Sequence, residues 1–193
     1  FNYDKNGNLV NNSGPNIVPG LLVDNNADSI AIINSLKKVG NITGKGGTPS
    51  IQVHDYNIDW AGISNDLAFS ADRTLGTGTY NGGTFGTYPK PEITLINGDA
   101  TFNGNLTGSG VLIVNGNITI RGTFNFQGMI IAYKESAITA ELNGNGTVLG
   151  SFIVSGNSVD MNLSNGSFTA KYSKETLANA QLNLKSSRFK ILS

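Results

Sequence analysis

The feature that most constrains this fold is an internal repeat between Glu92 and Tyr172. Four apolar runs recur, each followed by a polar turn, at Ile93–Ile96, Val111–Val114, Met129–Ala132 and Phe152–Val154. Equivalent positions in successive runs are 18, 18 and 22 residues apart, which matches one coil of a β-solenoid better than a helical repeat unit. The chain is therefore predicted to be mainly β, as a three-sided parallel β-solenoid of about four coils with short flanking or capping helices.

Aligning the runs on their turns gives the columns expected if each coil packs on the next. One column holds Leu95, Ile113, Ile131 and Ile153, and the column before it holds Thr94, Leu112, Ile130 and Phe152. A second strand alternates with period 2 in each coil, through Ala100 and Phe102, Ile118 and Ile120, Ile138 and Ala140, and Val159, Met161 and Leu163. A third side carries Leu106, Phe124 and Phe126, Val148, and Phe168 and Ala170, and the coils are expected to close at Gly108, Gly110, Gly128 and Gly150.

The turns align as well as the runs. Asn97-Gly98, Asn115-Gly116 and Ser155-Gly156 occupy one corner, where Asn and Gly suit a tight or left-handed backbone. Tyr133-Lys134 interrupts this pattern, so the corner of that coil is expected to differ. An Asn-Gly pair between apolar runs also signals an antiparallel hairpin, and an antiparallel sandwich is the alternative fold. The regular coil length favours parallel stacking.

Composition agrees with a turn-rich β protein and excludes several functions. The 193 residues include 25 Gly and 26 Asn, and only 13% are charged. The formal net charge of zero provides no basic field for nucleic acid. Without cysteine there is no disulfide, thiol nucleophile or Cys-rich metal site. No stretch reaches the roughly 18 to 20 apolar residues that span a bilayer, so we expect a soluble part of a larger protein, with any membrane anchor outside it.

The chain is expected to form one compact domain with three parts. Residues 1–90 form an N-terminal irregular and helical region that packs on or caps the solenoid, 91–173 form the solenoid, and 174–193 form a C-terminal helix and strand cap. Helices are predicted after Asp28 and over Asp59–Phe69 and Lys174–Asn183, from capping acids and apolar spacing. Strands are predicted at Ile51–Val53 and Phe189–Leu192, and Thr74–Thr87 is predicted to be a Gly/Thr-rich loop.

Several apparent motifs have plain structural interpretations. His54-Asp55 is the histidine-carboxylate pair that a Ser-His-Asp triad needs, but no G-x-S-x-G turn accompanies it, and we interpret His54 as structural. With one histidine, no metal site or cofactor is predicted. Gly44–Thr48 lacks the spacing of a phosphate-binding loop and is interpreted as a flexible turn.

Acidic residues raise the possibility of a solenoid enzyme that cleaves polysaccharide. The candidates are Glu92, Asp99, Glu135, Glu141 and Asp160. Asp99 and Glu135 align in one corner column, two coils or about 10 Å apart, and paired carboxylates support hydrolysis at about 5 to 9.5 Å. The favoured interpretation is non-catalytic, with a structural corner ladder formed by Asn97, Asp99, Asn115, Asn117, Glu135 and Asn157.

Three aromatic residues in the predicted loop are candidate ligand-binding groups. Exposed rings at Tyr80, Phe85 and Tyr88 would stack on sugars or bases, and packing of the loop on the solenoid explains them equally well. Arg73 and Lys90 are too few to indicate nucleic-acid binding. An ice-binding Thr array is not predicted, because Thr119 and Thr139 are out of register. The triplet Asn105-Leu106-Thr107 is one of many that an Asn- and Thr-rich chain contains by composition.

The segment from Glu92 to Ser193 resembles the carboxy-terminal region of bacterial PilX-type proteins of type IV pilus assembly. The resemblance lies in TLINGDATFNGNLTGSGVLIVNGNITIRGTFNFQGMIIA at Thr94–Ala132, VLGSFIVSGN at Val148–Asn157, YSKETLANA at Tyr172–Ala180 and FKILS at Phe189–Ser193. The chain also has a weaker similarity to bactofilins, small β-solenoids that polymerise end to end. These resemblances contribute no catalytic residues.

The resemblance implies a non-catalytic structural or adhesive module of the cell envelope or the extracellular space, the soluble part of a pilus-associated surface protein. Its expected partners are proteins of a pilus or envelope assembly, with surface glycans as a further candidate. The competing hypothesis is a carbohydrate-binding or polysaccharide-cleaving protein on the same scaffold.

Overall fold

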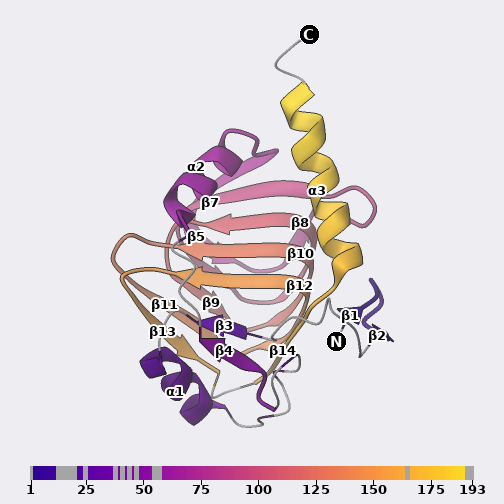
Figure 1. The fold of residues 1–193 in the computed structure, drawn as a ribbon. Coiled ribbons are helices and arrows are strands. Elements are labelled where there is room, and N and C mark those ends of the chain that lie inside the picture. The colour runs from indigo at the N-terminus through magenta and orange to yellow at the C-terminus, as the bar shows by residue number, and fades with distance from the viewer. Residues whose placement is uncertain are drawn as a thin grey trace.

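The computed structural model describes residues 2–11, 21–23, 26–36, 39, 42, 45, 48–53, 58–163 and 166–189. Within them the chain forms a parallel β-solenoid (Figure 1), which confirms the predicted fold class. All strand pairs of the solenoid sheet are parallel, so the antiparallel alternative is wrong. The strands that form the four predicted coils are β7 (Glu92–Phe102), β8 (Asn105–Val114), β9 (Ile118–Ile120), β10 (Thr123–Tyr133), β11 (Ala137–Leu142), β12 (Asn145–Ser155), β13 (Ser158–Asn162) and β14 (Ser167–Lys171).

Each coil has a first side that carries an apolar run, a second side after the Asn-Gly corner, and a third side before the closing glycine. Long strands bend through a corner and serve two sides. The predicted columns of the first side are confirmed, because Leu95 pairs with Ile113, Ile113 with Ile131 and Ile131 with Ile153. Three of the four predicted closing glycines, Gly110, Gly128 and Gly150, stack in one column, whereas Gly108 pairs with Phe126 on the third side.

Apolar side chains of all three sides meet in one core along the solenoid axis. The third side shows why, since exposed and buried residues alternate along it and Leu106, Phe124, Phe126 and Val148 are at most 1% exposed. Aromatic rings continue the contact between coils, with ring centroids of Phe102 and Phe124 5.1 Å apart. Side-chain alternation at period 2 therefore places one row inside and one row on the surface.

The first side is apolar without alternation because both of its faces are buried. Its outward residues pack under two helices, α2 (Trp60–Ala68) and α3 (Lys174–Phe189). Ile93, Leu95, Val111 and Ile113 form a second cluster with Ala180 of α3 and with Leu67, Ala68 and Ala71. Continuous apolar runs are the pattern expected of strands covered on both faces.

The solenoid begins earlier than predicted. Residues 74–87 were expected to be a loop, but β5 (Arg73–Tyr80) pairs in parallel with β7, and β6 (Gly83–Phe85) pairs in parallel with β8. We call residues 73–91 the leading turn. Its apolar residues are few, and Thr and Gly occupy most other positions of β5, which hid it from a search for apolar runs. The boundary at residue 90 therefore moves to 72.

N-terminal elements cover the opposite end of the stack. The predicted helix is present as α1 (Asn26–Ser35), which begins before Asp28 and contains that residue in its first turn. The strand β3 (Leu21–Val23) pairs with the predicted strand β4 (Ile51–Val53). These elements lie beside the last coil in Figure 1, where Ile42 forms a parallel bridge with Ala170 of β14. The remaining described strands, β1 (Asn2–Tyr3) and β2 (Leu9–Asn11), form a small antiparallel pair.

The two other helix predictions are also confirmed. Asp59 caps α2, because its carboxylate accepts a hydrogen bond from the Gly62 amide at 2.8 Å. The C-terminal helix is longer than predicted and includes Phe189, which was expected in a strand. Residues 190–193 lie outside the described residues.

Candidate functional site

Two of the three candidate aromatic residues belong to the core. The Phe85 side chain is 5% exposed, and the Tyr80 ring stacks on Phe102 with centroids 5.6 Å apart. The Tyr80 hydroxyl donates a hydrogen bond to the Gly76 carbonyl, and burial raises the pKa of Tyr80. Tyr80 and Phe85 therefore belong to the leading turn and close the end of the core with their side chains.

Tyr88 is held against the C-terminal helix. Its hydroxyl donates to Glu175 Oε1 at 3.1 Å, and this hydrogen bond is the main cause of a raised pKa at Tyr88. Lys5 Nζ lies 5.5 Å from the centroid of the Tyr88 ring. The structure thus does not bring Tyr80, Phe85 and Tyr88 together as an exposed stacking surface.

Part of the predicted corner ladder is present. Asp99 Oδ1 accepts a hydrogen bond from the Asn117 amide at 2.8 Å, and Asp99 Oδ2 accepts one from Asn117 Nδ2 at 3.3 Å. Asn117 Oδ1 then accepts from the Thr139 amide of the next coil at 2.8 Å. Beside this chain, Asn115 Nδ2 donates to Asn97 Oδ1 at 3.3 Å, and Ser64 of α2 donates to Asn115 Oδ1 at 2.8 Å. These side chains tie successive corners together.

Glu135 and Asn157 are not in that ladder, which corrects the predicted alignment. Ala140 pairs with Ile118, so Thr139 and not Glu135 follows Asn117 in the column. The 22-residue spacing places its additional residues in the corner after Tyr133, and Glu135 is exposed there. Asn157 lies in the corner of the next coil, and its amide donates to the Ser136 carbonyl of the enlarged corner at 3.2 Å. Asp99 and Glu135 therefore do not form the pair of stacked carboxylates that hydrolysis would require.

The other acidic candidates have structural partners or are dispersed. Glu92 forms an ion pair with Arg73 at 3.0 Å, and Glu141 lies 4.0 Å from Arg121. Asp160 is exposed on β13 and lies beside Thr139 of β11. Among the described residues, no three His, Cys, Asp or Glu side chains come close enough to hold a metal ion. His54 and Asp55 lie outside the described part of the chain.

A surface that the sequence analysis did not identify lies on the third side. Its outward residues are all exposed or half-buried and uncharged, and they stand in two parallel columns. We call them the Asn/Thr face. One column contains Asn105, Thr123, Asn145 and Ser167, and the other contains Thr84, Thr107, Asn125, Thr147 and Thr169.

Strand geometry makes the Asn/Thr face regular. Neighbouring residues of one column are about 4.8 Å apart, and the two columns are about 6.6 Å apart, because they lie two residues apart along each strand. Buried neighbours such as Phe124 and Phe126, at 0% and 1% exposure, fix the strands from inside. Adjacent coils also contact one another on the surface, since the Thr84 and Thr107 hydroxyls are 3.3 Å apart and Ser167 donates to Asn145 at 2.9 Å.

The sequence contains a signal for this face that the search for apolar runs passes over. Four triplets place a polar residue on either side of a residue that points inward: Asn105-Leu106-Thr107, Thr123-Phe124-Asn125, Asn145-Gly146-Thr147 and Ser167-Phe168-Thr169. They recur at spacings of 18, 22 and 22 residues. Attributing Asn105–Thr107 to composition alone overlooked this periodicity.

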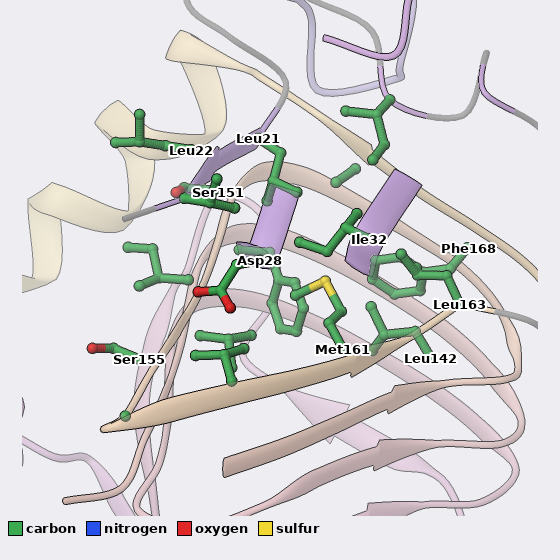
Figure 2. Close-up of a pocket in the computed structure, with 18 of the residues that line it drawn as sticks. Leu21, Leu22, Asp28, Ile32, Leu142, Ser151, Ser155, Met161, Leu163 and Phe168 are labelled. Carbon is green, nitrogen blue, oxygen red and sulfur yellow. The ribbon is translucent and has the colours of Figure 1, made fainter. Parts of the chain in front are cut away.

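A cavity of about 940 Å³ lies where the last coil meets the N-terminal cap. Figure 2 shows Met161, Leu163 and Phe168 of the coil on one side and Leu21 and Ile32 of the cap on the other. Asp28 of α1 points among these apolar side chains. The cavity is therefore mainly an apolar gap between the last coil and the N-terminal cap.

Comparisons with family models, with curated proteins and with solved structures find no match to this chain. Among the described residues, no helix combines the length and apolar character needed to cross a bilayer.

Proposed function

We propose that the protein is a non-catalytic structural and adhesive module of the bacterial cell envelope, the soluble part of a pilus-associated surface protein, and that the Asn/Thr face binds neutral polysaccharide. The envelope placement rests on the resemblance of residues 92–193 to PilX-type proteins. The binding function rests on one observation, the two columns of uncharged polar side chains on a rigid side of the solenoid.

The chemistry of these side chains matches a neutral ligand rich in hydroxyl groups. An Asn side chain offers an acceptor oxygen and two donor hydrogens, and a Thr or Ser hydroxyl both donates and accepts. No residue of the face carries a charge that would select an ionic ligand. A sugar hydroxyl can therefore find a partner at each position of either column.

The repeat of the face suits a polymer better than a single sugar. An individual hydrogen bond that replaces one to water contributes only about 0.5 to 1.5 kcal/mol. Equivalent contacts on successive coils occur within one molecule, so they add through effective concentration when the ligand is long enough to reach them. We expect weak binding of monosaccharides and measurable binding of polysaccharide chains.

Binding of the purified protein to neutral polysaccharides, both insoluble fibres and soluble chains, tests this function. The double variant Asn125→Ala with Thr147→Ala removes two neighbouring positions of one column, and we expect at least a roughly tenfold loss of affinity. The matched control is Thr101→Ala with Thr119→Ala, a pair of stacked residues on the second side. Binding that both doubles weaken equally, or no binding of any neutral polysaccharide, would contradict the proposal.

A reducing-sugar assay on the same samples tests the non-catalytic part of the proposal. We expect no release of reducing ends above a heat-inactivated sample. Release that disappears in Glu135→Gln or Asp99→Asn would replace the proposal by the polysaccharide-cleaving alternative.

A further inference from the structure

The leading turn presents an open strand edge. One edge of β5 pairs with β7, from Arg73 beside Thr94 to Tyr80 beside Phe102. In the part of the chain that the structure describes, no strand pairs with the other edge. Thr74, Gly76, Thr77 and Thr79 of this strand are all exposed. An edge of this kind is a template for a further strand.

Side chains close the core beneath this edge without covering the backbone. The Arg73 guanidinium lies 5.3 Å from the centroid of the Phe85 ring. It also donates to the Thr84 carbonyl at 3.3 Å and forms the ion pair with Glu92. With Tyr80 stacked on Phe102, the apolar interior is sealed. What remains open at this end is the row of backbone hydrogen-bonding groups.

The alternation of the backbone identifies one of those groups. The Tyr80 carbonyl accepts a hydrogen bond from the Asn103 amide at 2.9 Å, so Tyr80 directs its polar groups toward the next coil. Neighbouring residues of a strand direct theirs to opposite sides. The Thr79 amide and carbonyl therefore face the open edge.

The register between β5 and β7 shifts between Gly76 and Gly78. The strand otherwise lacks the side chains that natural proteins use to block such edges. It contains neither Lys nor Pro, and its charged residue, Arg73, is engaged with Glu92. Phe69, in the segment that leads from α2 into the leading turn, is 92% exposed. Phe69 precedes Arg73, the first residue of β5, by four residues, so its exposed ring can reach the margin of a contact made by this strand.

The opposite end of the stack limits what can bind. There α1 packs against β13, and Ile42 bridges to Ala170 of β14. A second copy therefore cannot add head to tail onto that end without displacing the cap. A contact that uses the same surface on both partners closes after two copies.

We propose that two copies of this chain dimerise through their leading turns, with β5 of one copy pairing antiparallel to β5 of the other about a twofold axis. Phe69 of each copy packs at the margin of this contact. The occupant is a second copy because β5 is rich in Gly and Thr and presents the same groups to its twin, and its one charged residue, Arg73, is ion-paired with Glu92. The dimer joins two solenoids end to end and does not depend on polysaccharide binding.

Sedimentation velocity across a wide range of protein concentrations tests this dimer. We expect a species of twice the 20.3 kDa chain mass that dissociates on dilution. Thr79→Pro removes an edge amide while leaving the ladder to β7 intact, and we expect at least a tenfold weaker dimer. Phe69→Ser is expected to weaken it in the same direction. Thr79→Val keeps the amide and serves as the matched control.

Circular dichroism and thermal melting show whether each variant folds. If Thr79→Pro does not fold, Thr79→Lys replaces it, because a lysine on an edge strand also opposes pairing with another strand. A protein that stays monomeric at every concentration overturns the proposal. A dimer whose affinity is unchanged both by the Thr79 variant and by Phe69→Ser also overturns it. So does a series of oligomers larger than the dimer, because their assembly would have to use the end of the solenoid that the N-terminal elements cover. If the protein dimerises as expected but binds no neutral polysaccharide, only the proposed function is contradicted.

Discussion

Gly128 lies directly on Gly110, and the carbonyl oxygen of Gly110 occupies the space that a Cβ on Gly128 would need. Gly150 has the same relationship to Gly128. All three residues have positive φ, at 128°, 135° and 140° along the stack. This column lets the chain turn from the third side to the first without separating the coils.

Gly128→Ala is therefore expected to lower the free energy of unfolding by about 2 kcal/mol or more, from backbone strain and overlap with the carbonyl below. Gly76→Ala is the control, because no atom beyond the adjacent residues of the chain lies within 4 Å of its Cβ position. Urea unfolding of both variants measures the difference. Equal stability of the two would contradict the close stacking of the glycine column.

Asn117→Ala should cost about 1 to 3 kcal/mol, because it removes the side chain between Asp99 and Thr139 and leaves their polar groups without this partner. Glu135→Ala should stay within about 0.5 kcal/mol of the wild-type protein, since Glu135 is exposed in the enlarged corner. The comparison uses the same denaturant titration. If Glu135→Ala were the more damaging change, the ladder would have the originally predicted members.

Phe85→Ala should destabilise the protein by about 3 to 5 kcal/mol, because it empties a position that is 5% exposed in the core. Phe69→Ala, at a residue that is 92% exposed, should have almost no effect on a dilute, monomeric sample. Thermal unfolding at low protein concentration measures both. A stable Phe85→Ala variant that had lost ligand binding would return Phe85 to the role of a binding residue.

Acid should open the turn between β1 and β2. Asp4 accepts hydrogen bonds from the Asn8 side chain and from the amides of Asn8 and Asn6, and these bonds lower the pKa of Asp4 below 3.8. A lowered pKa means that the contribution of Asp4 is complete above its ordinary pKa and is lost as the pH falls through the folded value.

Nuclear magnetic resonance of the Asp4 carboxyl and of the Asn6 and Asn8 amides, from about pH 6 to pH 2, measures this transition. The Asp4→Asn variant should lack it. A midpoint above the ordinary value for Asp would show that these hydrogen bonds do not favour the charged form.

Much of the solenoid could be predicted because its coils repeat the same physical requirement. Leu95, Ile113 and Ile131 each have to fill one layer of a stack, so the spacing of apolar runs fixes the register. The helices were predictable from local signals, such as the capping carboxylate of Asp59.

The errors arose where the repeat changes length or composition. Asp99, Asn117 and Glu135 are evenly spaced in the sequence, but the longer corner after Tyr133 moves Thr139 into the column. The leading turn was missed because Gly and Thr replace most of its apolar residues. The Asn/Thr face was missed because polar outward residues contribute little to the packing pattern that reveals a coil.

The bridge between Ile42 and Ala170 has a consequence for how the protein is made. During synthesis, Ile42 leaves the ribosome more than a hundred residues before Ala170 of β14, to which it bridges. The coils can fold one after another during synthesis. Ile42 can form its bridge only after β14, in the last coil, has been synthesised. Premature termination before β14 would therefore remove the strand to which Ile42 bridges, and proteolysis of such a product should begin near Ile42.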